Sequence, residues 1–459
     1  MRPYTALCSH LLFPLHERLK GHDSVAWRRR LERSQWWSPE EIARDQAQRL
    51  QRFMADIAAH VPYYRELFRA RGIDARSFDS VDALRALPLQ TKADIRTHTE
   101  AMTAEDHGPL KRYNTGGSSG EPLIFFIGKQ RVSHDVAAKW RATRWWGVDI
   151  GDPEMVVWGS PIELGLQDRA RLARDKLLRT ELLPAFELSP AKLDGFVEAI
   201  RRRRPAMLVG YPSALARIAR HAQERGTAMD ALGIRVAFVT SERLYDDQRA
   251  LISRVFGCPV ANGYGGRDAG FIAHECPSGG MHLSAEDIVV ELIGRDGSPV
   301  RDGEPGEIVV THLATRDFPF VRYRTGDVAV RDGARCACGR GLPLLREIQG
   351  RSTDFVVAAD GTVMHGLALI YVLRDLPGVA QFRIEQLSLD ETRVQVVPSD
   401  GFDAAGELRI EREFKARLGP EVKVEVERVA QIPAEASGKF RYVVSRVSMA
   451  SATGLKRAA

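Results

Sequence analysis

Between residues 150 and 280, short β-rich runs alternate with helical segments, and this alternation restricts the fold more than any other feature of the sequence. Helical periodicity is present at 213–224 and at 246–256. A chain that alternates strands and helices in this way usually forms a parallel sheet covered by helices. The predicted strands span residues 155–158, 207–209, 236–240 and 259–261.

The rest of the chain predicts further units around this sheet. With 459 residues, the chain is too long for one ordinary hydrophobic core, so two or three domains are expected. The first hundred residues are mainly helical in pattern, and after Gly280 strands follow without helices, which suggests an antiparallel or barrel-like annex. We therefore expect an α/β fold with a large N-terminal domain at 1–350, a small mobile α+β domain at 355–448 and a tail at 449–459.

The composition restricts the class of protein. Hydrophobic residues make up 44% and charged residues 27% of the chain, which is typical of globular proteins, and no run of about eighteen apolar residues predicts a membrane helix. The net charge of +6 suits an anionic substrate. The arginine runs at 28–30 and 201–204 could contact nucleic acid, but solvated helix faces are the favoured interpretation.

Five cysteines in a chain of this length do not indicate a disulfide framework. Residues 1–14 lack the cleavage site of a signal peptide and are expected to form a helix or arm. We therefore expect a cytoplasmic protein with neither a membrane nor a nucleic acid as its partner.

A glycine- and hydroxyl-rich segment at 113–122 has the strongest local pattern for a functional site. Glycines let backbone N–H groups approach phosphate oxygens without interference from a Cβ, and hydroxyls add further donors. The segment lacks the Lys-Ser or Lys-Thr end of the P-loop, and on its own it is compatible with either a phosphate-binding loop or a flexible connector. The candidate phosphate-binding residues are Thr115, Gly116, Gly117, Ser118, Ser119 and Gly120.

The sequence Thr-Gly-Gly-Ser-Ser-Gly-Glu-Pro at 115–122 resembles the phosphate loop of the adenylate-forming superfamily, in the form found in its phenylacetate–CoA ligase-like branch. That branch includes proteins from capsule and exopolysaccharide clusters. Further segments resemble the motifs of this family in the same order, and together they span nearly the whole chain. They are the adenine-contacting segment at 262–268, the ribose-binding motif at 322–327, the hinge at 350–354 and the lysine motif at 437–439, with 60–64 and 89–92 also similar.

The resemblance implies roles for single residues in an ATP site. Tyr264, followed by Gly265, would place its ring on the adenine, and Asp327 would accept hydrogen bonds from both ribose hydroxyls. Asp268 stands where the family has a glutamate that helps to hold Mg2+, although the pair Arg267 and Asp268 departs from the usual Thr-Glu pair. Taken alone, Tyr264 could instead be a packing residue and Asp327 a turn residue.

Two further roles lie toward the C-terminal end. Lys439 would reach the junction of carboxylate and phosphate and stabilise the charge that develops as pyrophosphate leaves. Arg351 would support the ribose or a phosphate, and Asp354 would be the pivot between the domains. On local pattern alone, a surface lysine and surface salt-bridge partners are the alternatives.

Cysteine and histidine residues in the middle of the chain predict a metal site. Cys276 and His282 form one short pair, and Cys336 and Cys338 form a second pair about fifty residues later. Three thiolates and one imidazole suit a tetrahedral structural Zn2+, and some members of the resembled branch bind zinc with a similar arrangement. His274 is a competing ligand, and small buried side chains without a metal are the alternative.

The resemblance implies a two-step ligase reaction with ATP, Mg2+ and CoA. A carboxylic acid would form an acyl-AMP, the C-terminal domain would rotate, and a thiol, most naturally that of CoA, would displace AMP. Residues 158–160, 211–213 and 239–242 are expected to line the acid pocket and suggest an apolar or aromatic acid. Transfer to an amine, a sugar or a carrier thiol is one alternative, because residues 355–361 depart from the family's thiolation loop. A non-catalytic nucleotide-binding scaffold is the other.

Overall fold

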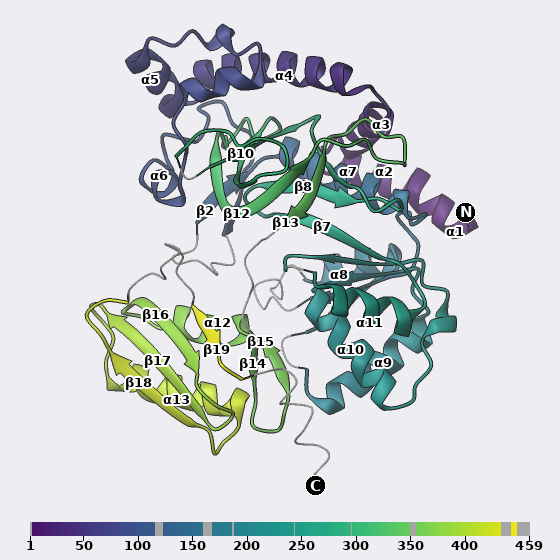
Figure 1. Cartoon of the computed structure of the whole chain (residues 1–459), viewed down its shortest axis with the longest axis vertical. Coiled ribbons are helices and arrows are strands. Elements are labelled where there is room, and N and C mark those ends of the chain that lie inside the picture. The colour runs from purple at the N-terminus through teal and green to yellow at the C-terminus, as the bar shows by residue number, and fades with distance from the viewer. Residues whose placement is uncertain are drawn as a thin grey trace.

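The computed structural model describes residues 2–114, 123–158, 168–185, 188–242, 244–294, 296–348, 355–432 and 442–447. Within these residues, eleven strands form one mixed sheet (Figure 1). The α/β fold expected from the alternation of strands and helices is confirmed. The strand order is β10 (Ile288–Ile293), β11 (Pro305–His312), β12 (Tyr323–Asp332), β13 (Leu344–Ile348), β9 (Met281–Leu283), β8 (Gly270–Glu275), β7 (Val260–Gly266), β6 (Val236–Thr240), β5 (Met207–Gly210), β3 (Glu154–Trp158) and β4 (Thr180–Pro184).

The strands from β7 to β4 run parallel to one another. Beside them lie α9 (Pro190–Arg203), α10 (Pro212–Glu224) and α11 (Asp246–Phe256), which gather at the lower right of Figure 1. Strand β5 is buried along its whole length, as a parallel strand covered on both faces should be. The two helices expected at 213–224 and 246–256 are present, and α11 ends at Gly257, a glycine in the left-handed conformation that commonly closes helices.

From β7 to β10 the neighbouring strands run antiparallel. The expected annex of strands therefore continues the parallel sheet, and the direction changes at the hairpin between β7 and β8. A Cβ on Gly265 would collide with the carbonyl oxygen of Gly270 across this hairpin. Only glycine permits so close an approach of two backbones.

Helices from the N-terminal hundred residues pack on the antiparallel strands. Helix α4 (Pro39–His60) shares one hydrophobic core with strands β8 to β12 and lies across the top of Figure 1. Its expected capping box is present: Glu41 N–H donates to Ser38 Oγ at 3.2 Å, and Ser38 N–H donates to Glu41 Oε2 at 2.8 Å. The prediction that a helix begins after Ser38 is therefore confirmed.

The arginine run of α3 (Ser24–Ser34) is not a solvated helix face. Arg28 is buried, with its guanidinium 4.5 Å from the ring centroid of Trp140 on α7 (Lys129–Trp145). Arg30 pairs with Asp287 at 3.1 Å. The expectation of a solvated face is wrong for these two residues, because sequence spacing does not reveal carboxylates and aromatic rings from distant segments.

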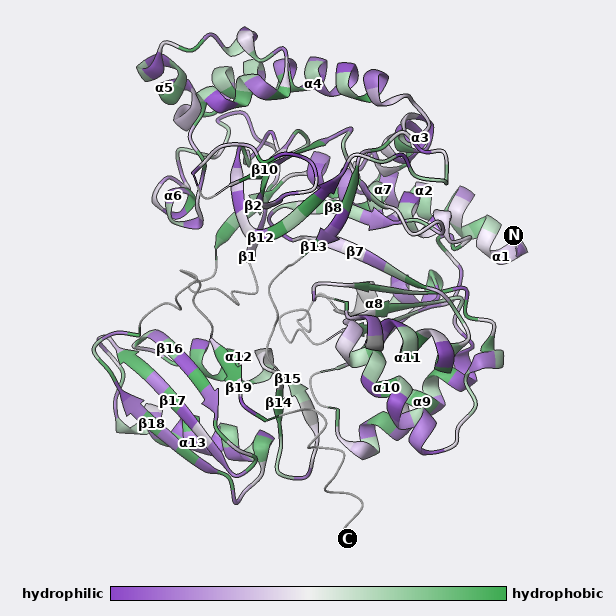
Figure 2. Ribbon diagram, in the orientation of Figure 1, coloured by the Kyte–Doolittle hydropathy of each residue, from purple (hydrophilic) through white to green (hydrophobic). Residues whose placement is uncertain are grey.

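The C-terminal elements form a separate four-stranded sheet in the order β18-β17-β16-β19. Two helices share its hydrophobic core, and Figure 2 shows the alternation of hydrophobic and hydrophilic residues along β16 and β17. The bounds are α12 (Leu367–Arg374), β16 (Val379–Gln386), β17 (Glu391–Pro398), α13 (Ala404–Leu418), β18 (Lys423–Arg428) and β19 (Val443–Ser445). The α+β pattern agrees with the expectation, while the exact domain boundaries stay a prediction. None of the described helices is long and apolar enough to cross a membrane.

Candidate active site

The predicted adenine and ribose residues meet in space. Tyr264 lies on β7 and Asp327 on β12, and the Tyr264 hydroxyl donates a hydrogen bond to Asp327 Oδ2 at 3.0 Å. Three strands separate β7 from β12 in the sheet order, so the antiparallel half must curve to bring these residues together. Burial, reinforced by the Asp327 carboxylate, raises the pKa of Tyr264 well above its usual value, so the hydroxyl stays a donor.

Asp268, the residue expected to hold Mg2+, is held both through its carboxylate and through its backbone. Tyr323 is fully buried, and its hydroxyl donates to Asp268 Oδ2 at 2.6 Å. Arg131 on α7 is also buried, and its two terminal nitrogens donate to the carbonyl oxygens of Asp268 and Arg267 at 3.2 Å. These bonds hold the tip of the β7–β8 hairpin in place.

Arg131 could not be found from the sequence, because its carbonyl partners lie more than 130 residues away. Arg322, the first residue of the ribose motif, has a structural role. Its buried guanidinium donates to both oxygens of Glu291, at 2.9 and 3.0 Å, and to the carbonyl of Leu87 at 2.6 Å. The motif therefore combines a buried anchor, Arg322, with the predicted ligand-binding residue Asp327.

Several predicted site residues fall outside the described residues. The glycine-rich loop connects β1 (Lys111–Asn114) with β2 (Ile124–Ile127), which pair antiparallel. Its residues Thr115, Gly116, Gly117, Ser118, Ser119 and Gly120 keep their role as a prediction, as do Arg351, Asp354 and Lys439.

The four predicted zinc ligands come together at one place. The ligand atoms of Cys276, His282, Cys336 and Cys338 all lie within 4.8 Å of one another. Cys276 Sγ lies 3.5 Å from Cys336 Sγ, and Cys338 Sγ lies 3.2 Å from His282 Nε2. A tetrahedral zinc site with ordinary Zn–S and Zn–N bonds has edges of roughly 3.5–3.8 Å, so these donors fit the ion with small adjustments.

The surroundings of His282 also suit metal binding. Its Nδ1–H donates to the carbonyl oxygen of Leu342 at 3.2 Å, which leaves Nε2 as the ligand atom on the side of Cys338. Burial lowers the pKa of His282 to about 4, so the ring is neutral near pH 7. Burial raises the pKa of Cys276 to about 12, so a metal ion would displace a proton there.

The competing ligand His274 is not part of this cluster. Its ring stacks on Phe271 with 5.5 Å between the centroids. A second group of close ligand atoms, on His134, Asp135 and His312, is unsuited to a metal ion. His312 Nδ1 accepts a hydrogen bond from a backbone N–H, so the ring carries its proton on Nε2, the nitrogen that faces Asp135 at 3.9 Å.

Comparison with known proteins agrees with this arrangement. Residues 356–446 match the family described as CapK C-terminal domain. Protein CapK of Staphylococcus aureus is 24% identical over 413 residues, which cover 88% of this chain and 89% of that protein. A phenylacetate-coenzyme A ligase of Thermus thermophilus is 25% identical over 440 residues, covering 88% of this chain and 96% of that protein. Over most of its length the chain is similar to proteins of the phenylacetate–CoA ligase-like branch of adenylate-forming enzymes.

The fold of this ligase-like chain agrees with a solved structure as well. A 2-hydroxyisobutyryl-CoA ligase, solved in complex with 2-HIB-AMP and CoA, superposes with a TM-score of 0.63 at 22% sequence identity. The match covers 93% of this chain and 94% of that chain. The shared fold extends over nearly the whole chain.

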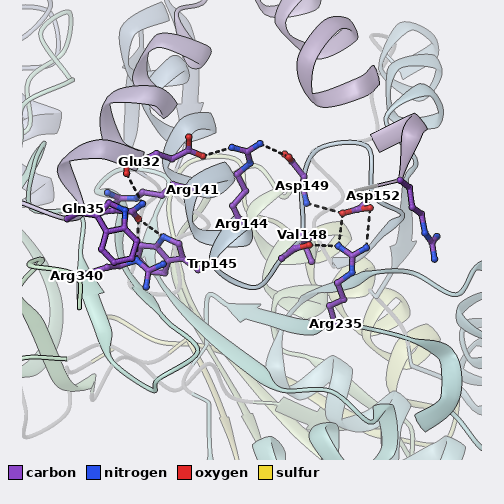
Figure 3. A pocket seen from close by; sticks show the side chains of 13 residues that line it. Glu32, Gln35, Arg141, Arg144, Trp145, Val148, Asp149, Asp152, Arg235 and Arg340 are labelled. Atoms are coloured by element: carbon purple, nitrogen blue, oxygen red, sulfur yellow. Dashed lines mark hydrogen bonds and ion pairs between the residues drawn. The ribbon is translucent and has the colours of Figure 1, made fainter. Parts of the chain in front are cut away.

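The ligase-like chain also contains a cavity of about 940 Å3 that none of the predicted nucleotide-site residues lines (Figure 3). Arg144 spans part of its wall, donating to Glu32 and to Asp149 at 2.6 Å each. Arg235 donates to Asp152 at 2.9 Å. Because arginines already neutralise the three carboxylates of the wall, this network braces α3, α7 and the following loop against the sheet.

Proposed function

We propose that this protein activates a carboxylic acid with ATP and Mg2+, releases pyrophosphate, and transfers the acyl group from the acyl-AMP to the thiol of CoA. The hydrogen bond between Tyr264 and Asp327 carries this proposal, because it joins the adenine and ribose motifs at one place. The relative named phenylacetate-coenzyme A ligase supports the same reaction class.

In the proposed first step, a carboxylate oxygen of the acid attacks the α-phosphorus of ATP. A P–O bond forms, and the bond from that phosphorus to the bridging oxygen of the departing pyrophosphate breaks. Tyr264 covers the adenine, Asp327 accepts the ribose hydroxyls, and the loop from Thr115 to Gly120 donates N–H groups to the phosphates. Bound Mg2+ would compensate the phosphate charge, with Asp268 as its protein carboxylate.

Lys439 and Arg351 complete the proposed site. The ammonium group of Lys439 would stabilise the charge that builds on the leaving pyrophosphate, and Arg351 would support the ribose or a phosphate. Arg351 lies between the two proposed domains, at 1–350 and 355–448, and Lys439 lies within the second. Rotation of the C-terminal domain would then replace Lys439 by the acceptor, which excludes water from the acyl-AMP.

An apolar or aromatic acid is the proposed substrate. Trp158 ends β3, and Tyr211 follows β5, so both lie at the carboxyl ends of parallel strands, where α/β sheets commonly bind their ligands. The two rings stack with 4.4 Å between their centroids. Tyr264 lies toward the same end of β7, which is separated from β5 by the parallel strand β6. A flat or apolar acid would find an aromatic wall close to the nucleotide.

We further propose one structural Zn2+ per chain, held by Cys276, His282, Cys336 and Cys338. Four protein ligands leave no coordination position for substrate, so the ion would tie the loop before β13 to β8 and β9. None of the five cysteines, all of them among the described residues, forms a disulfide. This supports a reducing compartment such as the cytoplasm.

The test is to incubate the purified protein with ATP, Mg2+ and a panel of apolar and aromatic acids, and to measure AMP and acyl-CoA with and without CoA. AMP and acyl-CoA formed in equal amounts would support the proposal. Acid-dependent AMP formed only with an added amine, sugar or carrier thiol would favour the alternative acceptor. No acid-dependent AMP with any acceptor would favour a nucleotide-binding scaffold.

A further inference from the structure

The N-terminal helical segment exposes its large hydrophobic side chains. Helix α1 (Pro3–Leu7), the π-helical turn η1 (Cys8–Leu12) and helix α2 (Phe13–Leu19) follow one another without a break. They lie at the right-hand edge of the molecule in Figures 1 and 2. Four leucines spaced four residues apart form what we call the leucine stripe. They are Leu7, Leu11, Leu15 and Leu19, with exposed fractions of 43%, 56%, 52% and 80%.

This exposure is concentrated and not scattered over the surface. Ten large hydrophobic side chains are exposed among the described residues, and the leucine stripe and Tyr4 account for five of them. The Tyr4 hydroxyl donates to the carbonyl of Leu177 at 2.8 Å, which brings a sixth, Leu177, next to the stripe. Contiguous apolar surface of this kind usually marks a site of interaction.

The opposite face of the segment fixes the orientation of the stripe. Thr5 Oγ1 donates to Asp152 Oδ1 at 2.9 Å, and the Phe13 ring meets the edge of Trp140 with 5.2 Å between the centroids. Glu17 is buried as well. The helix is therefore held to the protein by its polar and aromatic face, and the leucines point outward because the other face is occupied.

The π-helical turn keeps the leucines on one side. In a regular α-helix, residues four apart drift by about 40° around the axis at each step. The wider turn of the π-helix between Leu7 and Leu11 offsets part of this drift. Pro14, which has no N–H to bond back to His10, accounts for the irregular turn at this point.

The exposed charges on this segment are of one sign. Arg2, Arg18 and Lys20 are exposed at its two ends, whereas Glu17, the one acidic residue between positions 2 and 20, is buried. Burial and the positive charges of Arg174 and Lys111 lower the pKa of Lys20, whereas Glu17 and Asp175 oppose this effect. Basic groups from other segments therefore lie close by, although Arg174 is paired with Asp175 at 2.5 Å.

We infer that the leucine stripe and its basic flanks bind the surface of an anionic lipid bilayer, with the helix lying in the plane of the interface. An exposed row of leucines flanked by lysine and arginine is the pattern of interfacial helices. A second copy of this chain would place the same basic residues against one another, in a protein of net charge +6, whereas anionic lipids complement them. The inference departs from the sequence expectation of no membrane partner, which rested on the lack of a segment able to cross a bilayer. A helix that lies on a bilayer need not be long enough to cross it. This inference is independent of the proposed ligase reaction.

The test is cosedimentation of the full-length protein with vesicles of phosphatidylglycerol and phosphatidylcholine, and with vesicles of phosphatidylcholine alone. Wild type should bind the anionic vesicles and lose binding as salt is raised. The double variant Leu11→Glu/Leu15→Glu should bind about tenfold less or weaker still. Arg18→Glu/Lys20→Glu should weaken binding by roughly fivefold or more for each residue changed. The matched control is Leu408→Glu, a leucine on α13 that is 66% exposed outside the stripe and should leave binding unchanged.

Circular dichroism and thermal melting establish whether each variant is folded. If Leu11→Glu/Leu15→Glu is unfolded, Leu11→Ser/Leu15→Ser is used in its place. Lack of binding of wild type to anionic vesicles at low salt would overturn the inference. So would equal binding by wild type and a folded stripe variant. Light scattering behind a sizing column provides the third outcome: a dimer that Leu11→Glu/Leu15→Glu dissociates would make the stripe a contact between two copies and refute the membrane inference.

Discussion

Replacing Asp327 with alanine should weaken ATP binding, and Tyr264 should act on ATP partly through the same carboxylate. A hydrogen bond to a charged group contributes about 1.5–3 kcal/mol. Asp327→Ala removes the proposed acceptor for two ribose hydroxyls, so a loss of about 3 kcal/mol or more is expected, which is roughly a hundredfold or more in Kd. Tyr264→Phe keeps the ring that is proposed to cover the adenine and removes only the hydroxyl that bonds Asp327. That bond already exists in the free protein, so its loss costs only the orientation of the Asp327 carboxylate. We therefore expect the Kd for ATP to rise by tenfold at most.

The double-mutant cycle separates the two contributions. In the Asp327→Ala background, the hydroxyl of Tyr264 has lost its acceptor, so Tyr264→Phe should add less than about 0.5 kcal/mol. Calorimetric titration with ATP and Mg2+ measures all four proteins. The matched control is Asp332→Ala. Asp332 lies on the same strand, and its carboxylate accepts a hydrogen bond from the N–H of Ala334. Unchanged ATP affinity in Asp327→Ala, or fully additive effects of the two substitutions, would refute the ribose assignment.

Three further predictions concern the metal, the pH dependence and the lysine. Elemental analysis should find about one zinc per chain. The variant Cys336→Ser/Cys338→Ser should lose the zinc and melt at a lower temperature than wild type, and a folded wild type without metal would contradict the site. Burial lowers the pKa of His274 to about 3, so the unfolded chain binds more protons below pH 6.5. Stability should therefore fall as the pH drops from about 6.5 toward 4, by up to about 1.4 kcal/mol per pH unit for this ring. Urea unfolding at several pH values measures how the unfolding free energy depends on pH. If a folded His274→Gln variant shows the same pH dependence as wild type, the prediction is wrong. Lys439→Ala should lose roughly a hundredfold or more in adenylation yet still consume supplied acyl-AMP with the right acceptor; equal loss in both half-reactions would contradict its role.

Local elements could be predicted well from the sequence because their signals are local. Helix α11 and strand β6 have the bounds that periodicity and turn residues indicated, and the capping box of α4 is where Ser38 and Glu41 predicted it. The four candidate zinc ligands could also be picked out from the sequence, since soft side chains in two short pairs have few other uses. Their convergence within 4.8 Å is the part that needed the fold.

Long-range contacts could not be predicted in the same way. The bonds from Arg131 to the hairpin that carries Asp268 depend on how α7 packs against β8, and no spacing in the sequence encodes that packing. The leucine stripe illustrates the opposite difficulty. Leucines four residues apart usually indicate a buried helix face, but here Phe13 and its neighbours occupy the core and the leucines are left outside.

The central claim is that ATP and a carboxylic acid react at the site formed by Tyr264, Asp268 and Asp327. Exchange of labelled pyrophosphate into ATP tests it most directly, because exchange requires reversible formation of acyl-AMP and no acceptor. The account predicts exchange that depends on both Mg2+ and the acid, that Asp327→Ala lowers sharply, and that Asp332→Ala leaves intact. Absence of exchange across a broad panel of acids, with a folded protein that binds ATP, would contradict the account.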